Sequence, residues 1–356
     1  MDPPLPDLFD PDRAADFHYD PDPAAVFRAA IEWSARHRLP SAAADAGRTL
    51  LLLVDLQKDF CFPEGALYVA GRSGRGALED NRRVATFLYR NLARVSATLC
   101  TLDSHLPHHI FSPAFWVDAG GDTPAVHRTV TAAEIRSGTI RPRAELAHWV
   151  AGGDYDWLSR QVLHYCEELE RRGRYALYLW PPHCLVGSPG HAMVGVVQEA
   201  RLFHAYARRA EAGLEIKGLN VLTEHYSVLQ PEIATAHDGS TLAESGSKLA
   251  ERLLAADRLV IAGQAASHCV KNTLEDLLLA IEARDPALAG RVYILEDCMS
   301  AVVVRDPAAS ERVVADFTAP AQQALERCRR AGMHVVPSTL PMAEWPSPEP
   351  AGARCT

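Results

Sequence analysis

The chain of 356 residues lacks the patterns that mark membrane proteins and nucleic-acid-binding proteins. No stretch approaches the roughly 18 consecutive apolar residues that a membrane-spanning helix needs. The net charge is −9, and no run of lysine and arginine forms the basic surface that nucleic acid requires. We therefore expect neither a membrane nor a nucleic acid as a partner.

Cysteines at metal-binding or disulfide spacing are also missing. The eight cysteines are scattered and include no CxxC pair, which argues against a zinc ribbon. Scattered cysteines are typical of reduced thiols in the cytoplasm. Residues 1–7 are acidic and rich in proline, whereas a signal peptide begins with basic and then apolar residues. We expect a cytoplasmic protein.

The pattern that is present is an alternation of apolar strands and amphipathic helices. Continuous apolar runs such as 49–54 are typical of strands buried on both faces of a parallel sheet. Strands are predicted at 49–54, 95–102, 175–180, 214–222, 259–263, 291–297 and 332–336. Helices are predicted at 24–37, 78–93, 157–171, 191–212, 240–255, 270–283 and 310–331. The alternation predicts an α/β fold, a mostly parallel central sheet with helices on both faces.

The same pattern predicts three segments. Residues 1–47 are an N-terminal extension rich in proline and aspartate, residues 48–340 form the main domain, and residues 341–356 form a C-terminal tail. Within the main domain, about 115–173 has a looser pattern with several glycine and aspartate turns, which indicates an insertion between core elements. No internal repeat is visible.

Three reactive side chains lie in or directly after predicted strands. Cys269 lies where the strand at 259–263 leads into a helix, and a helix N-terminus favours a thiolate and can bind an oxyanion. Asp55 and Lys217 are an acid and a cation that could exchange the thiol proton and lower the thiol pKa. Taken singly, the cysteine is better explained as a buried core thiol, the aspartate as a cap or turn residue and the lysine as a solvated side chain.

A second group combines one carboxylate with histidines. Asp103, His105 and His109 follow the strand at 95–102, and His183 follows the one at 175–180. Aspartate and histidine ligands suit one divalent metal ion, for which we favour zinc and keep iron and manganese as alternatives. These histidines could instead be surface loop residues, and His108 competes for any ligand role.

Five motifs follow one another in a fixed order between residues 49 and 340. They are Val54-Asp55-Leu56-Gln57-Lys58-Asp59-Phe60, Asp103-x-His105-x3-His109, Trp180-Pro181-Pro182-His183-Cys184, Lys217-Gly218 and Gly263-x-Ala265-x-Ser267-x-Cys269-Val270. In this order they resemble the nicotinamidase branch of the isochorismatase-like cysteine hydrolases. Other branches share the Asp–Lys–Cys trio but generally lack the Asp/His ligand group, so its presence favours the nicotinamidase branch.

The resemblance implies roles for these residues. Asp55 matches the catalytic acid/base, Lys217 the catalytic lysine and Cys269 the nucleophile. The metal ligands of the family match Asp103, His105, His109 and His183. The turn before the nucleophile, with Gln264, Ala265 and His268, matches an oxyanion turn that contains a cis peptide bond between Gln264 and Ala265. Its donors are expected among the backbone N–H groups of 265–269.

The implied reaction is hydrolysis of nicotinamide, or of a related heteroaromatic carboxamide, to the acid and ammonia through a cysteine thioester. The metal would position the small-molecule substrate, and ring-stacking candidates are Phe60, Phe111, Trp116 and Trp180. Members of the family commonly form homo-oligomers, and we expect one here.

Several residues depart from the family pattern and leave the substrate open. Ser267 stands where many relatives have aspartate, Gln264 replaces an apolar residue, and 223–227 differs from the commoner Asp-Ser-Tyr-Ser run. The alternatives are hydrolysis of a ureido or carbamoyl compound, hydrolysis of a vinyl ether as in isochorismate, and a non-catalytic binding protein.

Overall fold

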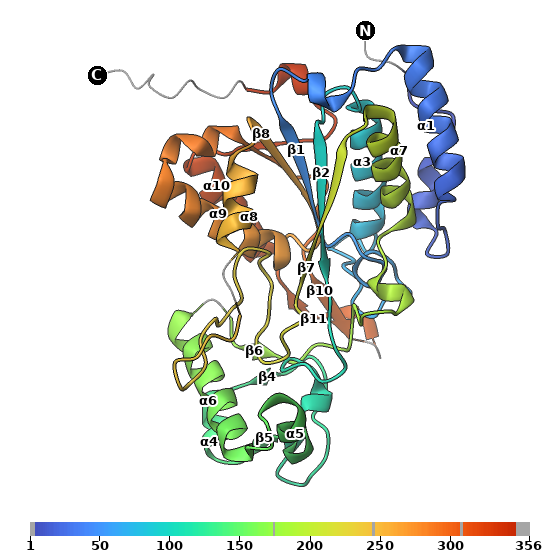
Figure 1. The fold of residues 1–356 in the computed structure, drawn as a ribbon. Helices are drawn as coiled ribbons and strands as arrows, with labels where there is room; N and C mark the ends of the chain where they lie inside the picture. Colours follow the sequence, from blue (N-terminus) through green and yellow to red (C-terminus); the bar gives the residue numbers. More distant parts are fainter. Residues whose placement is uncertain (1–3, 174, 244–245, 307–308, 347–356) are drawn as a thin grey trace.

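The computed structural model describes residues 4–173, 175–243, 246–306 and 309–346. Within these ranges, six strands form one parallel sheet in the order β12-β9-β8-β1-β2-β7 (Figure 1). The strands are β1 (Thr49–Val54), β2 (Ala97–Asp103), β7 (Glu211–Lys217), β8 (Arg258–Gly263), β9 (Val292–Leu295) and β12 (His334–Val336). The predicted class, a parallel α/β sheet, is confirmed.

Helices cover both faces of this sheet. One face carries α3 (Gly76–Arg90) and α7 (Gly195–Arg208), with α1 (Pro23–His37) packed outside α7 (Figure 1). The other face carries α8 (Ser247–Leu254), α9 (Cys269–Arg284) and α10 (Thr318–Arg330). Nowhere in the described chain is a helix both long and apolar enough to cross a membrane.

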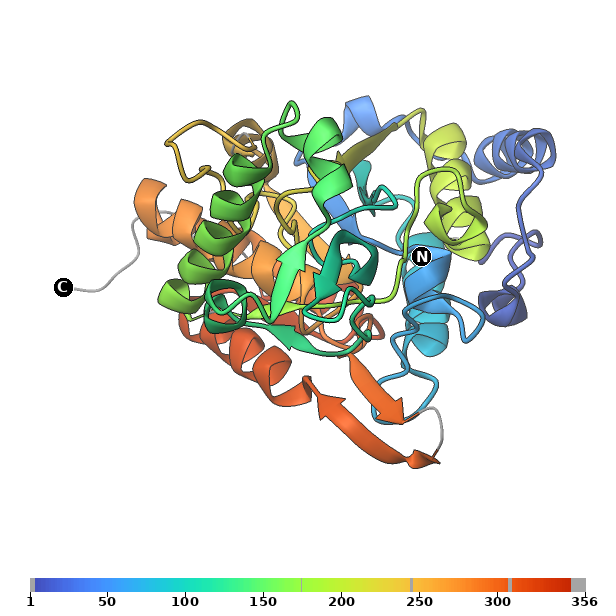
Figure 2. The same cartoon turned by 90° about the horizontal axis from the view of Figure 1, so that it is seen from below.

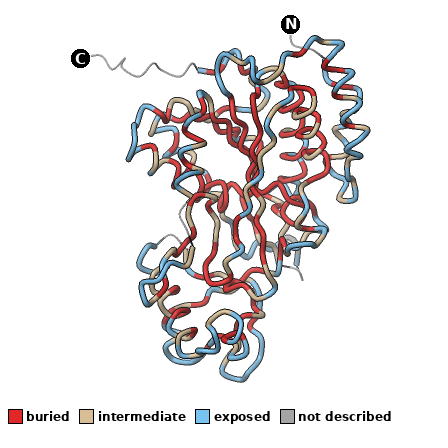
Figure 3. The backbone as a smooth tube through the Cα atoms, viewed as in Figure 1, coloured by how far each residue is buried: buried red, intermediate tan, exposed pale blue. Residues whose placement is uncertain are grey.

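The central strand β1 contributes to two hydrophobic cores, one on each side. Leu51 and Leu53 belong to the cluster beneath α3 and α7, while Leu50 and Leu52 belong to the cluster beneath α8 and α9. The strand is buried along its whole length (Figure 3), so the continuous apolar run follows from burial on both faces.

Residues 115–178 form a smaller group of elements beyond the carboxyl ends of the sheet strands (Figures 1 and 2). The strands pair antiparallel, β3 with β5 and β4 with β6. The elements are β3 (Trp116–Asp118), β4 (Thr129–Val130), α4 (Ala132–Arg136), β5 (Ile140–Pro142), α5 (Ala147–Val150), α6 (Tyr155–Arg172) and β6 (Leu177–Tyr178).

Three sequence-based assignments are wrong. The strand predicted at 214–222 is β7, which begins at Glu211 and ends at Lys217. The run 175–180 was expected to be a core strand, but only Leu177–Tyr178 is a strand, and it pairs with β4 outside the central sheet. The predicted helix at 310–331 begins only at Thr318. Before it lies an antiparallel hairpin of β10 (Val303–Asp306) and β11 (Ala309–Asp316). In the last two cases the pairing partner, β4 for β6 and β10 for β11, was not visible in the local pattern.

The remaining elements are short. They are α2 (Lys58–Cys61) and the 3-10 turns η1 (Pro11–Ala15), η2 (Ala42–Ala44), η3 (Pro113–Phe115), η4 (Ala144–Leu146), η5 (Pro189–His191), η6 (Pro286–Arg291) and η7 (Met342–Glu344).

The described part of the N-terminal segment is tied to the helical layer by a buried carboxylate. Glu199 of α7 is fully buried and accepts hydrogen bonds from Arg13 Nη1 (2.8 Å) and Tyr89 Oη (2.9 Å), and also from Tyr19. Arg13 and Tyr19 come from the N-terminal segment, whereas Tyr89 belongs to α3. The segment therefore packs on α3 and α7 through a paired buried charge.

At the other end, Trp345 packs into the core. Its ring stacks on Tyr293 (centroids 5.0 Å apart) and on Phe87 (5.9 Å), and its indole N–H donates to Leu340 O (3.0 Å). The expected tail, 341–356, thus contributes to the core as far as Trp345, and residues 347–356 lie outside the described ranges.

We expect Trp345→Ala to lower the free energy of unfolding by about 3 kcal/mol, because it removes a buried aromatic side chain with two stacking partners. Urea denaturation measures the change. Trp149→Ala is the matched control, because Trp149 is 52% exposed and should change the unfolding free energy little. Equal effects of the two substitutions would contradict this account of the C-terminal packing.

Candidate active site

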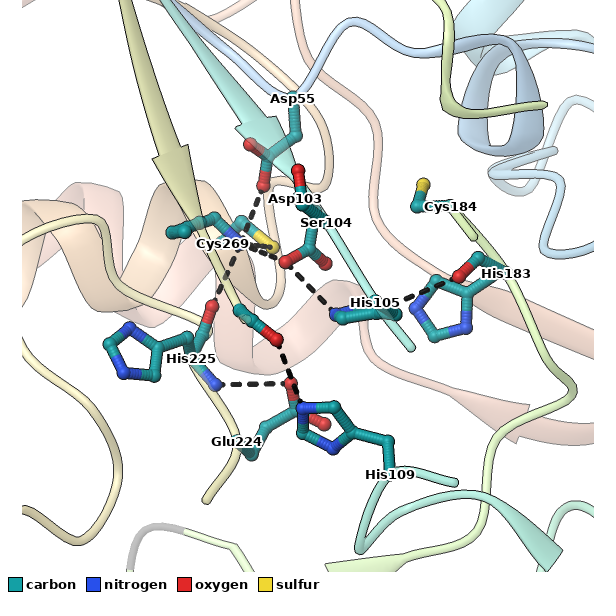
Figure 4. A network of polar contacts seen from close by, with 12 residues as sticks. Asp55, Asp103, Ser104, His105, His109, His183, Cys184, Glu224, His225 and Cys269 are labelled. Atoms are coloured by element: carbon teal, nitrogen blue, oxygen red, sulfur yellow. Dashed lines mark hydrogen bonds and ion pairs between the residues drawn. The ribbon is translucent and has the colours of Figure 1, made fainter. Parts of the chain in front are cut away.

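The reactive side chains meet at the carboxyl edge of the sheet. Asp55 directly follows β1, Asp103 ends β2 and Lys217 ends β7, and these three strands are neighbours in the sheet. Cys269 is the first residue of α9, which follows β8 on the other side of β1. Parallel strands place their carboxyl ends at one edge, so side chains from 48 (Asp55 and Asp103) to 214 (Asp55 and Cys269) positions apart converge (Figure 4).

The Lys217 ammonium is the centre of this group. Nζ lies 2.9 Å from Asp55 Oδ2, 2.9 Å from Asp103 Oδ1 and 3.6 Å from Cys269 Sγ, and it donates to His225 O at 2.8 Å. All of these side chains are buried. The structure therefore brings together the three residues predicted for catalysis.

Burial and charge set the protonation of the trio. Burial raises the pKa of the Cys269 thiol well above its ordinary value, and Lys217 only partly offsets this. Burial also raises the pKa of Asp55, again opposed by Lys217. For Lys217 itself, burial alone would lower the pKa, but Asp103 and Asp55 raise it well above its ordinary value. The resting trio thus combines a neutral thiol, a carboxylate that binds protons more readily than usual and a permanent cation.

Neighbouring side chains fix the position of Asp55. Its backbone has a positive φ of 44°, a conformation that aspartate tolerates better than most residues. Its backbone N–H donates to Thr101 Oγ1 at 3.0 Å, and the Thr101 hydroxyl donates to the carboxylate. Gln57 in turn donates to Asp103 O (2.8 Å) and accepts from Asp103 N (2.8 Å), which joins the ends of β1 and β2.

The turn before Cys269 supplies two backbone donors that have no described acceptor and line the cavity. The Gln264–Ala265 peptide bond is cis, as the resemblance implied. Of the predicted donors, Ala266 N already bonds Ser300 O (2.8 Å) and His268 N bonds Ala265 O (3.0 Å), so both are excluded. No described residue accepts from the backbone N–H of Ala265, Ser267 or Cys269, and of these three residues only Ala265 and Cys269 line the cavity at the site. These two N–H groups are the donors left for an oxyanion.

The predicted metal ligands converge beside the trio. Asp103, His105 and His183 each offer a ligand atom within 4.8 Å of the other two, and Asp103 Oδ1 faces His105 Nε2 at 3.1 Å. His109 lies next to this group, with its ring centroid 5.1 Å from that of His105. His108, the competitor, instead lies against Trp149.

The hydrogen bonds of the histidine rings fit a metal site. Nδ1 of His105 donates to His183 O (3.0 Å) and Nδ1 of His183 donates to Pro181 O (2.7 Å), so Nε2 is the ring atom of each that could face a metal. In His105 this atom lies 3.1 Å from Asp103 Oδ1, and although burial alone would lower the pKa of the ring, Asp103 raises it. Nε2 of His109 donates to Gly218 O (3.1 Å), so its Nδ1 is buried without a hydrogen-bond partner among the described residues. Backbone carbonyls orient metal-binding imidazoles in this way.

The pKa values of two of these rings, His183 and His109, also favour metal binding. Burial lowers the pKa of His183 to about 3 and that of His109 well below its ordinary value. Both rings are therefore neutral and keep a lone pair, the form that binds a metal.

A small cavity of about 30 Å³ adjoins Cys269. Its walls are Phe60, Leu67, Val69, Asp103, Trp180, His183, Glu224, Tyr226, Ala265, His268, Cys269 and Val302. The volume holds roughly one or two water molecules, so binding an aromatic amide requires wall side chains to move outward.

Two of the four aromatic residues predicted for the pocket do not line the cavity. Phe60 and Trp180 line the cavity, but Phe111 packs behind the metal group, with its ring 4.2 Å from that of His109. Trp116 is fully buried away from the cavity and donates its indole N–H to Ile110 O. Periodicity marks aromatic residues as buried but does not tell a pocket wall from a core.

Sequence reasoning missed Glu224. This carboxyl lines the cavity, and burial raises its pKa to about 7. The segment 223–227 had been noted only as a departure from the family pattern. Its sequence neighbours Thr223 and His225 are polar, so the residue pattern gave no signal that this acid is buried.

Several solved structures share the fold of this chain at low sequence identity. No family model and no curated protein matches the chain. Similar solved structures include a nicotinamidase/pyrazinamidase of Acinetobacter baumanii, with 17% identity, 83% of this chain and 98% of that chain covered, and a TM-score of 0.45. The yeast nicotinamidase shows 18% identity over 81% and 99% with a TM-score of 0.46. A pyrazinamidase of Pyrococcus horikoshii in complex with zinc shows 18% over 82% and 99%, with a TM-score of 0.41.

We expect His105→Ala to lower the zinc content of the purified protein from about one ion per chain to near zero, because it removes one of the three converging ligands. His109→Ala should weaken zinc binding by about tenfold, since this ring lies beside the group. Metal analysis after dialysis measures both. His204→Ala is the matched control, a buried histidine of α7 bonded to Val95 O. Full zinc content in His105→Ala would contradict the assigned site.

Proposed function

We propose that the protein is a metal-containing cysteine amidohydrolase that converts nicotinamide, or a closely related heteroaromatic carboxamide, to the acid and ammonia. One observation carries the proposal: a single buried ammonium, Lys217 Nζ, contacts Asp55, Asp103 and Cys269 at once. The contact joins the nucleophile and its base to the candidate metal group. The motif resemblance supports the same assignment.

Acylation begins with transfer of the Cys269 thiol proton to Asp55. The two side chains are hydrogen-bonded, and the raised pKa of Asp55 makes it a stronger base than an exposed aspartate. The sulfur then attacks the carboxamide carbon. The negative charge that develops on the carboxamide oxygen is bound by the N–H groups of Ala265 and Cys269.

Collapse of this adduct breaks the C–N bond. Asp55 returns its proton to the departing nitrogen, ammonia leaves and a thioester remains on Cys269. Asp55 next takes a proton from water, whose oxygen attacks the thioester. The C–S bond breaks, the acid is released and the proton returns to the thiol. Lys217 stays charged throughout, because its two carboxylate neighbours raise its pKa.

The candidate metal group explains why the substrate would be heteroaromatic. Asp103, His105 and His183 would hold a divalent ion, which would offer a ligand position to a ring nitrogen. Phe60, Trp180 and other aromatic walls of the cavity offer faces for the ring. Together these groups orient the amide toward Cys269.

We expect zinc-loaded wild-type protein to release ammonia from nicotinamide or from another member of a panel of heteroaromatic amides. Cys269→Ala should lower kcat at least about a thousandfold, because it removes the nucleophile. Coupled ammonia detection gives the rates. Cys328→Ala, a buried cysteine of α10, is the matched control and should retain activity.

The same panel tests the alternatives. Ureido and carbamoyl compounds and isochorismate are included, with pyruvate release measured for the last. Turnover of these substrates without turnover of any heteroaromatic amide would contradict the proposed substrate class. Undiminished amide hydrolysis by Cys269→Ala would contradict the mechanism.

A further inference from the structure

The polar side chain of Gln264 is fully buried immediately before the turn that carries the oxyanion donors. Both ends of its amide are bonded. Nε2 donates to Asp80 Oδ2 at 2.8 Å, and Oε1 accepts from Ser300 N at 3.2 Å. The side chain therefore connects helix α3, which carries Asp80, to the 296–302 loop.

Asp80 of helix α3 accepts the hydrogen bond from Gln264 and is itself fixed by further hydrogen bonds. It is 1% exposed, and its other oxygen accepts from Arg83 Nη2 at 2.8 Å. Arg83 also donates through Nε to Asp297 O, and the Ser300 hydroxyl donates to Asp80. Because a carboxylate can only accept in these bonds, it fixes the Gln264 amide with Nε2 toward the helix.

The 296–302 loop holds the turn directly as well. Ser300 O accepts from Ala266 N at 2.8 Å, and Val302 N donates to Ser267 Oγ at 3.0 Å. Two successive residues of the turn, Ala266 and Ser267, are thus hydrogen-bonded to this loop. The two cavity-lining donors without a described partner, Ala265 N–H and Cys269 N–H, lie on either side of Ala266 and Ser267.

We propose that Asp80 and Gln264 are positioning residues that hold the oxyanion donors of Ala265 and Cys269 in place for amide hydrolysis. The inference rests on the proposed function and extends it to two side chains outside the cavity wall. Donors that are already oriented stabilise a developing oxyanion without reorganisation, so loosening their support acts on the transition state more than on substrate binding.

The test uses Gln264→Met, which keeps the side-chain length without its hydrogen bonds, together with Asp80→Ala and the double variant. For the best amide of the panel, we expect kcat to fall by roughly 10- to 100-fold with KM within about threefold of wild type. The double variant should be no slower than the slower single variant, because the two residues act as one unit. Asp80→Asn, which keeps an acceptor for Gln264, should restore part of kcat.

A second readout separates positioning from general destabilisation. The aldehyde analogue of that amide adds the Cys269 thiol across its C=O bond and forms a tetrahedral adduct with the oxygen in the oxyanion position. Its affinity should fall by the same factor as kcat, whereas affinity for the product acid should stay within about threefold. Alkylation of Cys269 by iodoacetamide, which creates no oxyanion, should keep its rate.

Glu199→Gln is the control, because Glu199 is a buried carboxylate bonded to α3 through Tyr89 and remote from the turn. It should lower the melting temperature without changing kcat. If Gln264→Met and Asp80→Ala also lower only the melting temperature, or leave aldehyde affinity unchanged, the positioning role is overturned. An inactive zinc-loaded wild type would instead reject the proposed function, and this inference with it.

Discussion

The site depends on one buried ion group, the Lys217 ammonium between the carboxylates of Asp55 and Asp103. Two carboxylates that close together in the protein interior would repel each other and would be costly to desolvate without a cation. With the ammonium 2.9 Å from each, the base and the candidate metal ligand can share one small space. The same cation faces the Cys269 sulfur, so it couples the nucleophile to both.

The parallel sheet makes that convergence possible. Neighbouring strands β1, β2 and β7 end at one edge, and two hydrophobic cores hold β1 rigidly from both sides. Bonds between the strand ends, such as those of Gln57 with Asp103 and of Thr101 with Asp55, then fix the acids individually. Side chains held by such bonds need little rearrangement during a reaction.

The sequence was sufficient for the sheet class, for the trio and for the carboxylate–histidine group, because long apolar runs and ordered motifs are local signals. It failed where the outcome depends on distant partners. The run 175–180 looks like a core strand until β4 is seen to pair with it, and Trp116 looks like a pocket wall until Ile110 O is seen to bind its indole. Similarly, only the position of Ser300 shows that Ala266 N–H is unavailable to an oxyanion.

Covalent catalysis by Cys269 can be tested directly by mass spectrometry of the enzyme quenched in acid during turnover. The peptide containing Cys269 should gain the mass of the acyl group of the amide, and hydroxylamine should remove it. Turnover that leaves this peptide unmodified at every quench time, or an acyl group on a different residue, would contradict the account.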